Sequence, residues 1–130
     1  MHWLRFCLLV LASGTVVSMT DWFFAGDWIH RRWTYPEVWR TDESRAIALT
    51  SPLPFVTAAV FIAVVNALRL HSTVALIKFA IAVWVIGPLP LVLTNAAFIK
   101  LHRVFVASYA VGWLVKLAVI AATVALFGQG

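Results

Sequence analysis

Long apolar stretches separated by short polar segments recur four times along this chain. Each is close to the roughly 20 apolar residues that an α-helix needs to cross about 30 Å of hydrocarbon. Because lipid offers no hydrogen bonds to backbone amides, such segments are expected to close their hydrogen bonds internally, as helices. The stretches almost free of charge are Phe6–Thr20, Ala46–Leu68, Phe79–Ile99 and Val104–Gly130, the last interrupted only by Lys116.

This pattern predicts an all-α membrane protein that forms a single polytopic domain over residues 1–130. We expect four transmembrane helices in an up-down bundle, with a long interfacial loop between the first two. A Gly-Pro-Leu-Pro sequence begins at Gly87, and proline both removes a backbone hydrogen bond and clashes with the preceding turn. We therefore expect a kink or a break near Gly87. The expected spans are residues 3–24, 52–68, 74–93 and 104–127.

Two alternatives concern the first two spans. The short apolar core Phe6–Ala12 followed by small residues also fits a secretory signal. Apolar residues resume as far as Phe24, however, and favour an uncleaved first helix. The second span begins either near Pro52, after a short interfacial helix, or as one long helix that starts at Asp42 and is kinked at the prolines.

The connection between the first two spans, residues 25–51, is rich in aromatic and basic residues. Tryptophan and tyrosine prefer the headgroup layer, where one end of the side chain is apolar and the other is wet. We therefore expect this loop to lie on the membrane surface. Its predicted interfacial residues are Trp28, Trp33, Tyr35 and Trp39, with Arg31, Arg32 and Arg40.

Composition and charge narrow the class of protein. The 130 residues are 63% hydrophobic and only 12% charged, and the formal net charge is +5. A soluble domain carries about 25% charged residues. Because the basic residues flank apolar runs, the expected partners are the lipid bilayer and its anionic headgroups, and no nucleic acid.

The distribution of lysine and arginine predicts the orientation. Under the positive-inside rule, the side that carries more of these residues faces the cytoplasm. Both termini are then on the outer side of the membrane, opposite the cytoplasm. We expect this membrane to be a bacterial inner membrane. The cytoplasmic set is Arg31, Arg32, Arg40, Arg45, Lys100 and Arg103, and the opposite set is Arg5, Arg69 and Lys78.

Lys116 is the clearest candidate for a functional residue. A charge at the centre of a span costs about 2.5–3.5 kcal/mol on insertion scales and usually faces the interior of a bundle or a cavity. Tyr109, Gly112, Lys116 and Thr123 form one stripe along the fourth helix. Lys116 either contacts a substrate, an anion or a lipid headgroup, or its ammonium snorkels to the interface. We expect it to face the bundle or an oligomer interface.

Asp21 is the only acid within a predicted span. It lies about 5 Å from the cytoplasmic end of its helix, whereas Lys116 lies about 20 Å from the corresponding end of the fourth. On this argument from depth, Asp21 pairs with Arg103, Arg31 or Asn95 rather than with Lys116. Asn66 is expected to form a hydrogen bond between helices.

A metal site is a further alternative. His30 and His102 fall on the predicted cytoplasmic side together with Asp27, and histidine with carboxylate suits zinc or iron. Their spacing matches no diagnostic motif.

Two parts of the sequence carry a resemblance. The segment Met1-His2-Trp3 leads into a helix ending in Thr20-Asp21-Trp22-Phe23-Phe24-Ala25-Gly26, and Tyr35-Pro36-Glu37-Val38-Trp39-Arg40 follows. Together with the Gly-Pro-Leu-Pro sequence at Gly87, they resemble small bacterial four-helix membrane proteins of unknown function. The resemblance covers mostly the first forty residues and implies the architecture alone.

Three functional hypotheses follow. The first is a non-enzymatic accessory or interaction subunit without a cofactor, working as a homodimer or in a larger membrane complex. The second is a small oligomeric transporter or permease that uses Lys116 and Asp21. The third is a membrane redox or metal protein that uses the cytoplasmic-side histidines. The sequence contains no phosphate loop, no catalytic triad and no paired carboxylates of an enzyme.

Overall fold

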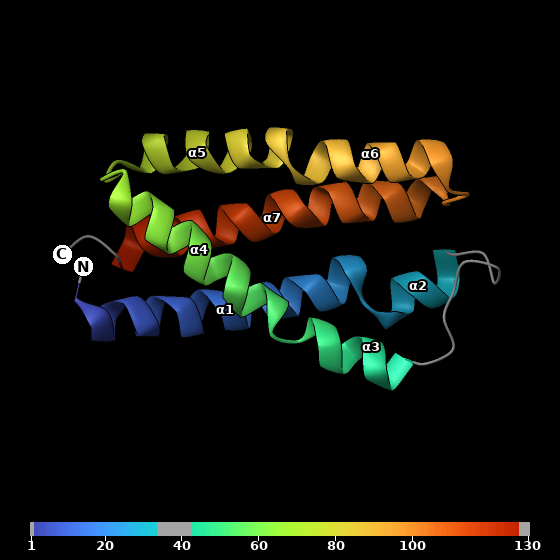
Figure 1. Cartoon of the computed structure of the whole chain (residues 1–130), viewed down its shortest axis with the longest axis horizontal. Helices are drawn as coiled ribbons and strands as arrows, with labels where there is room; N and C mark the ends of the chain where they lie inside the picture. Colours follow the sequence, from blue (N-terminus) through green and yellow to red (C-terminus); the bar gives the residue numbers. More distant parts are fainter. Residues whose placement is uncertain (1, 34–42, 128–130) are drawn as a thin grey trace.

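The computed structural model describes residues 2–33 and 43–127, except the side chains of Asp27, His30, Arg31 and Glu43. Over the described residues its secondary structure consists of helices alone, as predicted (Figure 1). The predicted interfacial residues Tyr35, Trp39 and Arg40 lie outside the described residues. The helices are α1 (Trp3–Ala25), α2 (Asp27–Trp33), α3 (Glu43–Thr50), α4 (Leu53–Ala67), α5 (Thr73–Ile86), α6 (Pro88–Phe98) and α7 (Arg103–Phe127).

Within the described residues, four helical segments are long and apolar enough to cross a membrane, which is the pattern of a multi-pass membrane protein. The second segment joins α3 to α4 and starts earlier than the predicted residue 52. The third joins α5 to α6 and continues past the predicted residue 93. The four segments are Trp3–Ala25, Ser44–Ala67, Thr73–Phe98 and Arg103–Phe127.

The two composite segments are interrupted where proline occurs. Gly87 separates α5 from α6, and Pro88 opens α6, where its missing N–H would have had no helical acceptor. The break expected near Gly87 is therefore confirmed. A turn at Ser51 and Pro52 separates α3 from α4 in the same way.

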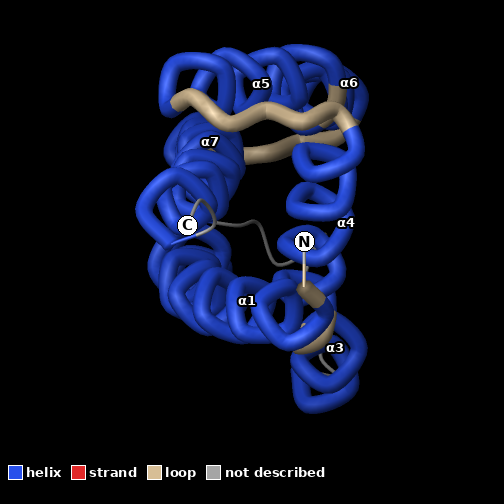
Figure 2. Tube along the Cα trace, turned by 90° about the vertical axis from the view of Figure 1, so that its left-hand side faces the viewer, coloured by secondary structure: helices blue, strands red, loops and turns tan. Residues whose placement is uncertain are grey.

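α7 is the central helix of the described bundle. It packs against α1 along much of its length and also against α5, α6 and α4, while α1 packs against α4 as well. Figure 2 shows α1 and the α5–α6 pair at opposite ends of this view, with α7 and α4 between them on either side. The shared apolar core includes Val17 of α1, Ile62 of α4, Leu76 of α5, and Leu117 and Ile120 of α7.

The start of α1 lies beside the end of α7 (Figure 1). The Arg5 guanidinium donates two hydrogen bonds to the Phe127 carbonyl oxygen, with N···O distances of 3.1 and 2.9 Å. The last carbonyls of a helix have no hydrogen-bond partner within the helix, and Arg5 satisfies one of them. Its positive charge also interacts favourably with the negative end of the α7 dipole. α1 and α7 are thus antiparallel neighbours.

Candidate functional site

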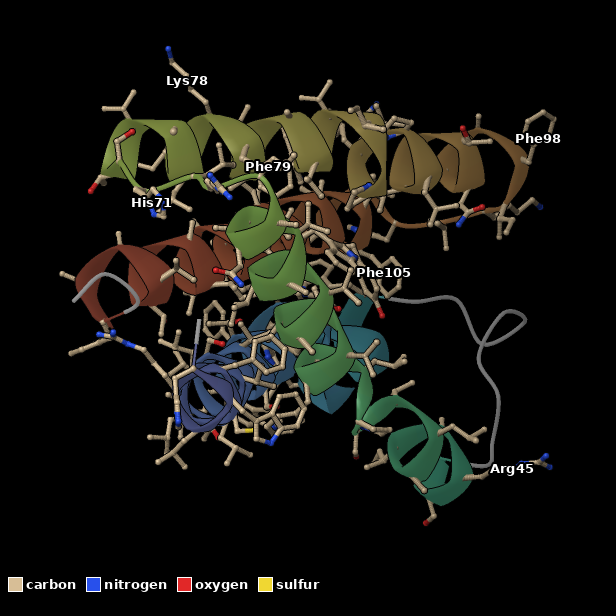
Figure 3. The ribbon with its side chains drawn as sticks, turned by 60° about the vertical axis from the view of Figure 1, so that its left-hand side comes forward. Arg45, His71, Lys78, Phe79, Phe98 and Phe105 are labelled. Atoms are coloured by element: carbon tan, nitrogen blue, oxygen red, sulfur yellow. The ribbon has the colours of Figure 1, made fainter. Side chains whose placement is uncertain are left out.

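Lys116 lies inside the bundle, against α1. The residue is 7% exposed, and its Nζ is 3.0 Å from the Asp21 carboxylate oxygen Oδ1. The same Nζ lies 3.9 Å from the centroid of the Trp113 ring, one turn earlier on α7. A carboxylate and an aromatic face therefore both stabilise the ammonium. The basic side chains of Lys78 and Arg45, in contrast, extend away from the bundle (Figure 3).

The prediction that depth separates Asp21 from Lys116 is wrong. It assumed that α1 and α7 end at the same level. Instead Ser108 of α7 donates a hydrogen bond to the Phe24 carbonyl near the end of α1. The first five residues of α7 therefore extend about 7.5 Å beyond this level, beside α2.

The same register explains how the pair meets. Measured from the level of Phe24 and Ser108, Asp21 is about 4.5 Å along its helix and Lys116 about 12 Å along its own. The flexible stem of the lysine spans the remaining 7.5 Å or so. Arg103 and Asn95, two of the partners expected for Asp21, are exposed instead, and the side chain of the third, Arg31, is not described.

A glycine lets the two helices approach closely at this point. A Cβ atom added to Gly112 would lie 2.6 Å from the Cβ of Phe24, which is too close for two atoms attached directly to backbones. Small residues at helix interfaces in membranes serve this purpose. Gly112 is thus one condition for the ion pair, because it brings α7 near enough to α1.

The carbonyls at the end of α1 also find side-chain donors. Trp28 Nε1 donates to the Phe23 carbonyl at 2.7 Å, and the Ser108 hydroxyl donates to the carbonyl of the next residue, Phe24. The sequence indicated Trp28 only as an interfacial aromatic, and it gave no signal for Ser108. Without such donors, these carbonyls would be costly in a membrane.

The other polar candidates of the spans lie away from the pair or at its edge. Tyr109 is half-buried one turn from Trp113, and its ring lies 4.5 Å from that of Phe105. Asn66 and Asn95 are exposed near the ends of α4 and α6, where their backbone carbonyls accept the N–H groups of Arg69 and Ile99.

Of the three residues in the metal-site hypothesis, only His102 has a described side chain, because those of His30 and Asp27 lie outside the described part of the structure. Among the side chains that the structure describes, no group of three or more His, Cys, Asp or Glu could hold a metal ion. His102 Nδ1 accepts the Val104 N–H at 3.1 Å, and its ring lies 4.9 Å from that of Trp33. His30 and Asp27 both belong to α2, a helix that the sequence analysis did not predict.

The ion pair offers two kinds of chemistry. It can join the first and last spans as a fixed clamp, because separating it would leave a charge uncompensated in a region of low dielectric. Alternatively it can exchange a proton or an anion, since the Asp21 side chain is 29% exposed and open on one side. No protein-family model, curated protein or solved structure matches this chain, so the functional argument depends on this geometry alone.

Proposed function

We propose that this chain is a non-enzymatic accessory or interaction subunit that associates laterally with other proteins in a membrane, as a homodimer or in a larger complex. One observation carries the proposal: Asp21 neutralises Lys116 within the chain. The outward faces of the spans then present mainly large apolar side chains to their surroundings. Examples, one from each span, are Met19, Val60, Ile81 and Val111. No cofactor is part of this proposal.

The proposed topology has four spans in alternating directions, an up-down bundle with both termini outside and residues 25–51 on the cytoplasmic face of a bacterial inner membrane. Its supports are the excess of Lys and Arg in the connections assigned to the cytoplasm and the alternating course of the helices in Figure 1. Trp28 and Trp33, at the ends of α2, suit the headgroup layer of that face.

Native mass spectrometry after extraction in a mild detergent tests the proposed role. We expect the chain to be released with a fixed stoichiometry, either as a homodimer or with one other membrane protein. The exposed Ile81→Trp and Val60→Trp variants report which face is used, because only the face in contact should lose its partner. A chain recovered solely as a monomer, at every detergent concentration, would contradict the proposal.

The transporter hypothesis remains as a second candidate because the Asp21 carboxylate is partly exposed beside a buried ammonium. Proteoliposomes loaded with a pH-sensitive dye distinguish the two. A transporter using the pair should conduct protons in the parent and lose this flux in Lys116→Leu. Equal flux in parent, Lys116→Leu and empty vesicles would exclude proton transport through the pair and favour the accessory role.

A further inference from the structure

The end of α2 meets the start of α7 at one corner of the bundle. α2 packs against α7, and the ring centroids of Trp33 and His102 are 4.9 Å apart. The Arg32 guanidinium carbon lies 5.4 Å from the centroid of the Trp33 ring. Arg32, Trp33 and the connection from Ile99 to Arg103 therefore form one surface, which we call the basic corner.

At the basic corner, Arg32 and His102 have contacts that hold their side chains in place. His102 Nδ1 accepts the Val104 N–H at 3.1 Å, which fixes the orientation of the ring. The Trp33 ring packs against the His102 ring. The Arg32 guanidinium forms a cation–π interaction with the same Trp33 ring. A held set of donors loses less side-chain entropy when a ligand binds.

The described side chains of the basic corner carry positive charge. Arg32, Lys100 and Arg103 are exposed there. α7 has no acid in its first turn, and its 25 residues place a positive dipole end at the same point. From Ser44 to Gly130 the sequence contains no Asp or Glu, so neither α6 nor α7 offers a counter-charge. The acids assigned to this side of the membrane are Asp27, Glu37, Asp42 and Glu43, against Arg31, Arg32, Arg40, Arg45, Lys100 and Arg103.

An apolar surface borders the basic corner. Phe98 is 87% exposed at the end of α6, and Ile99 next to it is also exposed. Figure 3 shows Phe98 extending outward at the end of that helix. Basic groups directly beside exposed apolar groups match an amphiphilic ligand. Its phosphate would bind the basic groups and its acyl chains would contact the apolar groups.

We propose that the basic corner is a binding site for an anionic phospholipid, with the phosphate at Arg32, Lys100 and Arg103 and the acyl chains along Phe98 and Ile99. This inference deepens the proposed function by naming one partner and its site, and it depends on the chain being embedded in a membrane. The bound lipid would join α2 to α7, beside the segment of α7 that extends past the end of α1.

Native mass spectrometry of the purified full chain with added phosphatidylglycerol or phosphatidylcholine tests the proposal. The test variant is Lys100→Gln with Arg103→Gln. The matched control, Arg69→Gln with Lys78→Gln, removes two exposed basic residues elsewhere in the spans and their connections. We expect the test variant to retain phosphatidylglycerol about 30-fold more weakly, which corresponds to ~1 kcal/mol for each basic residue near an anionic headgroup. The control and all phosphatidylcholine adducts should be unchanged.

Several outcomes would overturn the proposal. Equal losses in test and control variants would indicate unspecific attraction, and an unchanged test variant would exclude the site. Displacement of the lipid by millimolar inorganic phosphate would indicate a site for a soluble anion. The Phe98→Gln variant, which keeps every basic group, should also retain phosphatidylglycerol more weakly. Full retention of the lipid by this variant would contradict the proposed contact between Phe98 and the acyl chains. If the parent retained neither lipid, the membrane proposal itself would fail, and not only the site.

Discussion

At the scale of single residues, the position of Lys116 depends on its neighbours. An uncompensated lysine in the middle of a span is costly, and usually it either snorkels or finds a partner. Here Asp21 on one side and Trp113 on the other surround the ammonium. Gly112, one turn before Lys116, lets the helix that carries the base approach the helix that carries the acid.

The first prediction concerns the ion pair. Lys116→Met strands a carboxylate and Asp21→Asn strands an ammonium, so each should lower the free energy of unfolding by about 3 kcal/mol. The double variant has no stranded charge and should be within about 1 kcal/mol of the parent. Unfolding in mixed micelles measures this coupling. Lys78→Met, at an exposed lysine, is the control and should change little. Strictly additive losses would show that the two residues do not act as a pair.

The second prediction concerns the close approach at Gly112. Alanine is the better helix former by about 1 kcal/mol, so helix propensity alone would make Gly112→Ala stabilising. Because the new Cβ would overlap the Cβ of Phe24, we expect instead a loss of about 1–3 kcal/mol. Thermal unfolding in detergent measures it, with Ala118→Leu on the exposed face of α7 as control. A rise in stability would mean that the helices are not in contact at this point.

At the scale of elements, the break at Gly87 divides one span into two helices that both pack on α7. Just before the break, Trp84 Nε1 donates to the Ala110 carbonyl of α7 at 2.8 Å. This hydrogen bond joins α5 to α7 directly. It therefore fixes the point at which the span changes its course.

The third prediction concerns this hydrogen bond. Trp84→Phe keeps an aromatic ring but removes the donor, and hydrogen bonds between membrane helices contribute about 0.6 kcal/mol on average and at most ~1.7. We expect a loss near the upper end, because the smaller ring also leaves a void. Trp22→Phe, at a residue that is 65% exposed on α1, is the matched control. Equal effects of the two substitutions would contradict a specific role for Trp84.

The elements themselves were largely predictable from the sequence, and their register was not. The gaps in charge identify four apolar helices, and proline at 88 locates the break. α2 was missed because seven residues mixing tryptophan with charges give no periodic signal. The contact between Phe24 and Ser108 decides which residues of α1 and α7 meet, and no local pattern encodes it. Lys116 and Asp21 were both chosen as candidates, but their pairing required that register.

At the scale of the whole molecule, the fourth prediction concerns orientation. In a background with Cys7→Ser, we expect Ser44→Cys to react with a membrane-impermeant maleimide only from the cytoplasmic side. Gln129→Cys should react only from outside. Lys and Arg are concentrated in the connections on the side of Ser44, which favours this orientation. Labelling of the Gln129→Cys variant from the cytoplasm would overturn it. Labelling of both variants from the same side would require an even number of spans between the two positions, instead of the three proposed.

The clamp between α1 and α7 also has a consequence for biogenesis. Synthesis proceeds from the amino end, so Asp21 enters the membrane with the first span and Lys116 with the last. Until α7 is made, the acid has no lysine, and when α7 inserts, Lys116 opposes insertion by about 2.5–3.5 kcal/mol unless α1 is still within reach. A first span that stays near the translocon while the intervening spans emerge would offset this penalty. A chain that stops before α7 therefore leaves Asp21 without its lysine.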